Sequence, residues 1–353
     1  MSLLAHITSR IAAHGPMRLD EYMTTCLLHP SLGYYTTRDP LGGKGDFVTA
    51  PEISQMFGEL VGLSFAQSWL DQGAPACFTL AELGPGRGTL MADALRAVEN
   101  VPGFIKAAQI TLIEASPTLR AIQEQTLAGH DVTWVQDTSA LPDQPLFLIA
   151  NEFFDALPIR QFVRESNQWR ERQVGLKGDA LVMGLGPAQP QPMLEGRLKD
   201  TQDGELVESC AAATPIMDSI ATRIAKWGGA ALIIDYGDWR TKGDTLQAVK
   251  AHCKVGPLDT PGDADLTAHV DFEALAMAAQ GCVASQLTAQ GIFLERLGIT
   301  QRAQTLAKKL VGPALDTHIA AHRRLTHPSE MGNLFKVMAL CANECPPPAG
   351  LES

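Results

Sequence analysis

The sequence has no long apolar run, although 45% of its 353 residues are hydrophobic. A membrane-spanning helix needs roughly 18 to 20 consecutive apolar residues, and no stretch of the chain approaches that length. Residues 1–14 alternate apolar with polar side chains, so they do not form a signal-peptide core. Arg10 and Arg18 are followed by Asp20 and Glu21, which does not fit a mitochondrial transit peptide. We therefore expect a soluble cytoplasmic protein without membrane insertion.

The sequence also has few of the features that bind metals or nucleic acids. Its seven cysteines are scattered, with no Cys-x-x-Cys pair and no neighbouring histidine cluster, so we expect reduced thiols and no metal site. Acidic residues outnumber basic ones, 39 against 28, which gives a net charge of -11. Nucleic-acid-binding proteins usually present a basic face. We therefore expect no nucleic-acid partner, and a basic, arginine-bearing partner suits this charge better.

Short apolar segments alternate with helical segments from Cys77 onwards, which predicts an α/β fold with a parallel sheet covered on both faces. The expected parallel strands are Phe78–Ala81, Gln109–Ile113, Val132–Val135, Leu146–Ala150 and Ala230–Ile234. Two later apolar segments, Cys282–Thr288 and Leu334–Leu340, are expected to close the edge of the sheet as antiparallel strands.

Three units are predicted along the chain. They are a helical annex with a lid (1–73), a core (74–157 and 211–353) and an inserted β subdomain (158–210). One long helix is expected over Pro51–Leu70, because Thr49 or Ala50 can cap it and proline suits the first turn. A proline-rich loop is expected within the insert, over Gly186–Pro192.

The first candidate site is the glycine loop between the first strand and its helix. Gly84, Gly86 and Gly88 follow the strand, and ligands of α/β sheets bind at this edge. A dinucleotide fingerprint has its third glycine one residue later, where this chain has Thr89. Glu82 would repel a pyrophosphate but accepts a hydrogen bond from an amine. The pattern favours a phosphate-free adenosine compound that carries an amino acid, and the alternative is an ordinary tight turn.

Two acids that follow the next two strands are further candidates for this ligand. Glu114 ends the second strand, where a carboxylate can accept both ribose hydroxyls. Asp137 follows the third strand and is expected to face the adenine amine. The alternatives are a helix cap for Glu114 and a solvated turn for Asp137.

The end of the fourth strand carries the candidate catalytic residues. The stretch Asn151–Pro158 combines two acids, Glu152 and Asp155, with two aromatic residues and an amide, and we assign Asn151 to the cofactor. A pair of carboxylates suits a cationic acceptor such as a guanidinium, and it can orient the nucleophile and take its proton. The alternative is that both acids bind loop amides. Asp235-Tyr236-Gly237, after the fifth strand, are expected to line the acceptor pocket.

A third cluster lies upstream, in a glycine-rich region that includes Gly42–Glu52. Such a region can form a mobile cover, with Tyr34, Tyr35 and Phe47 packing on the adenosine or the acceptor. Asp46 is a further candidate catalytic acid. A plain surface loop is the alternative. His269 is a weaker candidate from a late loop, where Asp271 is expected to cap a helix at Phe272.

Several of these stretches together resemble the MidA-like family of class I methyltransferases, which includes a mitochondrial complex I assembly factor that methylates an arginine. The matching stretches are His29–Tyr35, Gly45–Glu52, Glu82–Gly88, Asn151–Pro158, Ile234–Gly237, Asp265–Phe272 and Met331–Val337, and they span nearly the whole chain. The glycine loop is generic to the class, whereas Gly45–Glu52 and Asn151–Pro158 are specific to the family.

The resemblance implies a Rossmann-like sheet of about seven strands and S-adenosylmethionine bound by Gly84–Gly88 and Glu114. It also implies a protein partner with an accessible arginine, which in the family can be a subunit of a respiratory complex. Two rivals stay open: a non-catalytic assembly factor that retains the donor pocket, and an NAD-linked oxidoreductase with the same fold. Homo-oligomers are possible.

Overall fold

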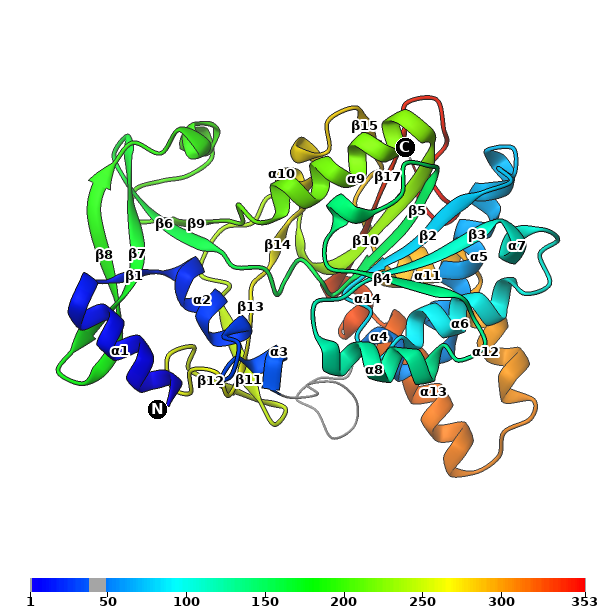
Figure 1. Cartoon of the computed structure of the whole chain (residues 1–353), viewed down its shortest axis with the longest axis horizontal. Helices are drawn as coiled ribbons and strands as arrows, with labels where there is room; N and C mark the ends of the chain where they lie inside the picture. The colour runs from blue at the N-terminus through cyan, green and yellow to red at the C-terminus, as the bar shows by residue number, and fades with distance from the viewer. Residues whose placement is uncertain (1, 38–48, 353) are drawn as a thin grey trace.

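A computed structural model describes residues 2–37 and 49–352, and its main feature is a large mixed sheet (Figure 1). Seven strands lie in one line, in the order β15 (Cys282–Ala284), β17 (Phe335–Ala342), β10 (Gly229–Asp238), β5 (Leu146–Asn151), β2 (Phe78–Leu83), β3 (Ala108–Ile113) and β4 (Val132–Val135). Two short strands, β14 (Val270–Asp271) and β16 (Thr288–Ala289), pair with β10 and β17. The predicted seven-stranded α/β sheet is confirmed.

The sheet is parallel from β10 to β4 and antiparallel at its other edge, as predicted. β17 pairs antiparallel with β10, and β15 and β16 pair antiparallel with β17. All six residues of β2 and of β5 are buried, because helices cover both faces of the sheet. Since the five parallel strands run the same way, their carboxyl ends meet at one edge.

Alternate residues of each central strand enter two different cores. Leu80, Phe147 and Leu232 face the core beneath α5 (Gln55–Asp71), α6 (Thr89–Val98) and α12 (Ile299–Ala307). Ala81, Leu148 and Ile233 face the core beneath α9 (Ala213–Trp227) and α10 (Phe272–Ala278).

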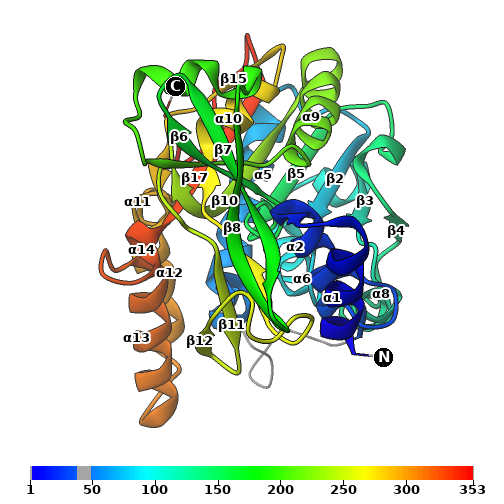
Figure 2. The ribbon, with the colours of Figure 1, turned by 90° about the vertical axis from the view of Figure 1, so that its left-hand side faces the viewer.

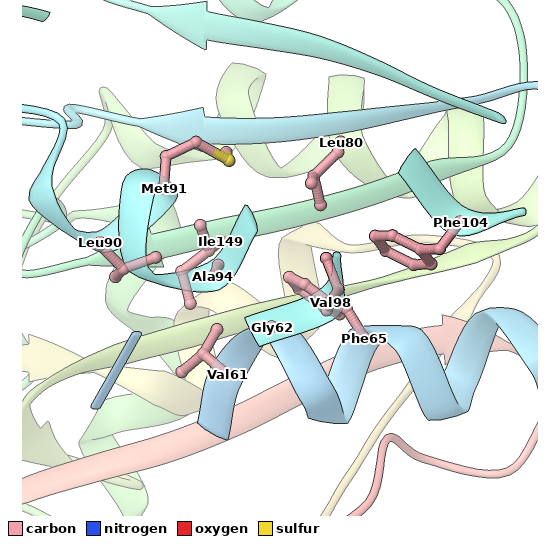
Figure 3. A pocket seen from close by; sticks show the side chains of 10 residues that line it. All are labelled: Val61, Gly62, Phe65, Leu80, Leu90, Met91, Ala94, Val98, Phe104 and Ile149. Carbon is pink, nitrogen blue, oxygen red and sulfur yellow. The ribbon is translucent and has the colours of Figure 1, made fainter. Parts of the chain in front are cut away.

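The first of these cores is packed by apolar side chains from α5, α6 and the sheet (Figure 3). Gly62 of α5 is needed there, because a Cβ would lie 2.8 Å from the backbone of Ala94 in α6. Every residue that lines this part of the core is apolar, so it offers no polar group to orient a ligand.

A second, antiparallel sheet lies beside the two N-terminal helices (Figures 1 and 2). Its strands are β1 (Met17–Arg18), β7 (Gln168–Lys177), β6 (Arg160–Glu165) and β9 (Leu206–Ser209) in that order, with β8 (Ala180–Gln189) paired to β7. The helices α1 (Leu3–His14) and α2 (Leu19–Leu28) share one hydrophobic core with this sheet, which includes Ile7, Met23 and Val174.

A third, three-stranded sheet contains β12 (Cys253–Val255), β11 (Gln247–Lys250) and β13 (Asp265–Thr267). The remaining elements are α3 (Tyr34–Thr37), α4 (Ala50–Ile53), α7 (Phe104–Ala107), α8 (Pro117–Thr126), α11 (Gln290–Arg296), α13 (Pro313–Thr326), α14 (Met331–Leu334) and two 3-10 helices, Thr138–Ala140 and Pro192–Lys199.

Two expected elements differ in the structure. The helix expected over Pro51–Leu70 is split into α4 and α5, because Ser54 is extended (φ -160°, ψ 135°) and its hydroxyl caps α5 by accepting the N–H of Met56. The loop expected over Gly186–Pro192 was wrong in its first half, because β8 runs to Gln189 along β7.

The division into annex, core and insert stays a prediction. The packing favours an earlier end for the annex, because α5 lies against α6 and belongs to the core beneath the main sheet. Among the described residues no helix is long and apolar enough to cross a membrane.

Candidate functional site

The glycine loop joins β2 to α6 at the carboxyl edge of the sheet. Gly84, Gly86 and Gly88 all have positive φ, of 58°, 53° and 80°, a conformation that glycine adopts without strain. A Cβ at Gly84 would lie 2.9 Å from the ring of Phe153, so the loop also contacts the acidic stretch that follows β5. Glycine is therefore needed in this loop for its backbone conformation and, at Gly84, for the close contact with the Phe153 ring.

Glu82 lies just before this loop, with only 3% of its surface exposed. Burial raises the pKa of its carboxyl group to about 8. Its Oε2 atom is buried and has no hydrogen-bond partner among the described residues. A buried acceptor without a partner is costly, so this atom is suited to a donor group on a ligand.

Glu114 follows β3, and its carboxylate is oriented by two hydrogen bonds. Oε1 accepts the N–H of Ser116 at 2.7 Å, and Oε2 accepts Nε2 of Gln123 at 3.1 Å. Burial raises the pKa of this group. Carboxylate oxygens have further lone pairs, so Glu114 can still accept hydroxyls of a ligand.

Gln123 was not identified from the sequence, although it ties three parts of the site together. From α8 it donates to the carbonyl of Gly86 at 2.8 Å as well as to Glu114, and its Oε1 accepts the indole N–H of Trp134 at 2.8 Å. The side chain is fully buried. No local pattern in the sequence marked it, because Gln123 differs from the other polar residues of Pro117–Thr126 only in its burial.

Replacing Gln123 with methionine should weaken S-adenosylhomocysteine binding by about tenfold or more. Methionine keeps the volume but loses the hydrogen bond to the Glu114 carboxylate, and such bonds are worth about 1.5–3 kcal/mol. Isothermal titration calorimetry measures the effect. Gln72→Met is the matched control, because Gln72 bonds the backbone of Gly229 away from this edge. Equal affinities in the two variants would contradict the role.

Asp137 precedes the first 3-10 helix and caps it. Oδ1 accepts the N–H of Ser139 at 2.8 Å and also the hydroxyl of that residue. These bonds lower the pKa of the carboxyl group. The Oδ1 atom of Asp137 is therefore engaged in the turn. A contact between its Oδ2 atom and adenine stays a prediction.

Asn151 and Glu152 end β5, where the chain leaves the sheet with an unusual backbone. Glu152 has a φ of 52°, which is rare for a residue with a side chain and often marks a functional site. Its Oε1 accepts the N–H of Ala50 at 3.0 Å and Nδ2 of Asn151 at 3.1 Å. Burial raises the pKa of Glu152 to about 7. Oδ1 of Asn151 is buried without a partner among the described residues.

Asp155 lies three residues further on, and Asp235 of β10 lies next to it. Both are buried, with 6% and 0% of their surfaces exposed. Burial, followed by the charge of a neighbouring acid, raises the pKa of each. Together with Glu152, which is partly exposed, they form a cluster of three carboxyl groups, which we call the acid cluster.

The remaining candidates lie around this cluster. Tyr34 is fully buried in the core of the annex, so its ring is not available to a ligand, whereas the hydroxyl of Tyr35 donates to Asp265 at 2.8 Å. The ring of His269 packs edge-on against Tyr236, with centroids 5.3 Å apart, and burial lowers its pKa. Asp271 caps α10, as expected. Asp46 and Phe47 lie outside the described residues and stay predictions.

The site has the groups that a phosphate-free adenosine donor with an amino acid needs. Glu82 and Asn151 offer buried oxygens that have no partner in the part of the chain that the structure describes, Glu114 offers an oriented carboxylate, and the glycine loop leaves room for close approach. No group of acids, histidines or cysteines suited to a metal ion occurs in 2–37 and 49–352.

Comparison with known proteins agrees with this chemistry. Residues 60–292 match the model of a family described as "Putative S-adenosyl-L-methionine-dependent methyltransferase". The chain is 38% identical to the rat protein named "Protein arginine methyltransferase NDUFAF7, mitochondrial", over 97% of this chain and 85% of the relative. The human protein of that name is 37% identical, over 97% and 84%.

Two crystal structures from Burkholderia thailandensis are similar over nearly the whole length. One, described as a "likely methyl transferase" and bound to S-adenosyl-homocysteine, has a TM-score of 0.81 and 28% identity and covers 99% of this chain and 92% of that one. The other, a native structure, has a TM-score of 0.78 with the same identity and coverage.

The comparisons correct the expected location. The rat, human and fruit-fly relatives are named mitochondrial, so the cytoplasmic prediction is contradicted. That prediction used only the composition of the first residues of the chain, which does not outweigh similarity along its whole length. The chain belongs to the family of S-adenosyl-L-methionine-dependent methyltransferases, and S-adenosylmethionine is its methyl donor.

Proposed function

We propose that this enzyme methylates an arginine side chain of a partner protein and that Glu152 and Asp155 hold the guanidinium group. The observation that carries the proposal is the acid cluster. Three carboxyl groups lie together, of which Asp155 and Asp235 are buried and Glu152 is partly exposed, and none of them belongs to an ion pair between described residues. Buried charges need a partner, so the cluster is suited to a cationic ligand. The relatives named arginine methyltransferases support the same acceptor.

The residues of the chain have distinct roles in this proposal. Bound S-adenosylmethionine supplies an electrophilic methyl group. Glu82, Asn151 and Glu114 bind the donor, while the two carboxylates orient one guanidinium nitrogen by charge-assisted hydrogen bonds. That nitrogen loses one proton as it is methylated, and we propose that Glu152 takes it, since its pKa of about 7 matches this task.

Methyl transfer should rise with pH through about 7. The pKa of Glu152 is raised by burial, so below about 7 the group is neutral and attracts no cation. The guanidinium stays charged throughout, because its pKa is above about 12. Asp155, Asp235 and Tyr236 face the same space, and the positive charge of Arg324 acts on Glu152. The pH profile of kcat/KM tests this, and a flat profile through neutrality would contradict it.

A labelling experiment identifies the acceptor. Purified protein is incubated with methyl-labelled S-adenosylmethionine and a cell lysate, and mass spectrometry locates the label. We expect methylarginine in a protein, and we propose a subunit of a respiratory complex as that protein. Label on another residue type would overturn the arginine assignment. Donor binding without any transfer would favour the non-catalytic assembly factor instead.

A further inference from the structure

Asp235 is the most deeply buried member of the acid cluster, with none of its surface exposed. Its strand, β10, runs beside β5, and the pairing of the two strands ends where Ile234 meets Asn151. Beyond that point the chain that follows β5 turns away from the sheet through Glu152, whose φ is positive. Asp235 is therefore next to the stretch that carries the proposed guanidinium ligands.

The carboxylate of Asp235 accepts three backbone N–H groups. Oδ2 accepts those of Phe154 at 3.0 Å and Asp155 at 3.2 Å, and Oδ1 accepts that of Tyr236 at 2.9 Å. The residue before it contributes as well, because the carbonyl of Ile234 accepts the N–H of Glu152 at 2.8 Å. Two consecutive residues of β10 thus hold the acidic stretch along its length.

A neutral amide of similar shape cannot make all three of these bonds, because its NH2 group would face one of the N–H groups. An amide has one acceptor oxygen, whereas a carboxylate has two and can serve N–H groups on both sides. The carboxylate is also costly at this position, because Asp235 is buried beside two other acids that disfavour its charge. Both oxygens are already engaged by the backbone, so Asp235 is suited to holding the loop and not to contacting an acceptor.

We propose that Asp235 is a positioning residue for methyl transfer, which fixes the backbone of Phe154 and Asp155 so that the Asp155 carboxylate is held toward the acceptor. This inference depends on the proposed function, because it assigns the consequence to the residues that bind the guanidinium. Small displacements of groups that position a substrate lower the reaction rate, and a shift of about 1 Å can reduce it by about 100-fold.

Asp235→Asn tests the proposal, with Glu59→Gln as the matched control. Glu59 is also a buried acid, but it pairs with Arg302 and Arg96 in the helical layer. In Asp235→Asn we expect kcat for label transfer to lysate protein to fall about 100-fold. The affinity for S-adenosylhomocysteine should stay within about twofold of wild type, since no donor-binding group changes. Glu59→Gln should lower the melting temperature with kcat retained.

The outcomes separate this inference from the proposed function. If the wild-type protein methylates no arginine, the proposed function fails. If the wild-type protein methylates arginine but Asp235→Asn keeps the wild-type kcat, the positioning role is wrong. It is also wrong if the variant loses donor affinity by as large a factor as it loses kcat. Should the variant not fold, hydrogen exchange on wild-type protein still decides, because the Phe154 and Asp155 amides are then expected to be strongly protected. Rapid exchange of these amides in the folded protein would overturn the proposal.

Discussion

Glu152→Gln is expected to reduce methyl transfer by about 100-fold or more while leaving S-adenosylhomocysteine binding intact. The glutamine keeps an oxygen that can accept the N–H of Ala50 and the amide of Asn151, so the local structure should persist. What is lost is the negative charge that attracts the guanidinium and the base that takes its proton. Proton transfer by a positioned side chain typically contributes about 10²–10⁴-fold to a rate.

Label incorporation and calorimetry, measured side by side, check this expectation. Glu59→Gln again provides a change from acid to amide at a buried site outside the acid cluster. Asp155→Asn should resemble Glu152→Gln if the two carboxylates act on one acceptor. Full activity in both Glu152→Gln and Asp155→Asn would mean that the two acids only bind loop amides, which is the alternative that the sequence left open.

Gly84→Ala is expected to weaken S-adenosylhomocysteine binding by about 10–100-fold. A left-handed backbone costs a residue with a Cβ roughly 1–2 kcal/mol, so the free loop is expected to leave this conformation, and a donor that binds only the original conformation loses up to that free energy, where about 1.4 kcal/mol is a factor of ten in affinity. The new Cβ would also lie 2.9 Å from the Phe153 ring, so either the ring or the glycine loop must move. Both belong to the edge where the donor binds.

The chain offers a control for the backbone strain alone. Gly129 also has a positive φ, of 100°, but a Cβ there would meet no atom within 4 Å. Gly129→Ala should therefore lower the melting temperature through backbone strain alone, while donor affinity stays at the wild-type level. Unchanged affinity in Gly84→Ala would remove the glycine loop from the donor site.

The strands of the main sheet could be predicted because their sequences are apolar and buried on both faces. Phe78–Leu83 and Leu146–Asn151 show this pattern, and both form central strands. The small sheet of β11, β12 and β13 was not predicted. Its strands are short and partly polar, so their pairing depends on tertiary contacts that a local pattern does not contain. The break at Ser54 was missed for a similar reason, because the flanking residues all suit a helix.

The sequence indicated the types of residue in the site better than it indicated their partners. Glu82 lies near the end of β2, and Glu114 and Glu152 follow β3 and β5, so their common edge could be predicted. The roles of Gln123 and Asp235 could not, because each acts on backbone groups that are distant in sequence. The lid role of Tyr34 stays a prediction, and its ring is buried in the core that α1 and α2 share with the antiparallel sheet.

The pairing of β1 with β7 has a consequence for how the protein is made. Met17 and Arg18 bond to Val174 and Gln173, so the apolar faces of the N-terminal helices find their partners only after the chain reaches these later residues. Ribosomes add about 5–20 residues per second, which leaves a wait on the order of ten seconds. Throughout that interval we expect Leu3, Ile7 and Ile11 to lack the strand partners that cover them in the folded protein, which leaves apolar surface exposed to aggregation.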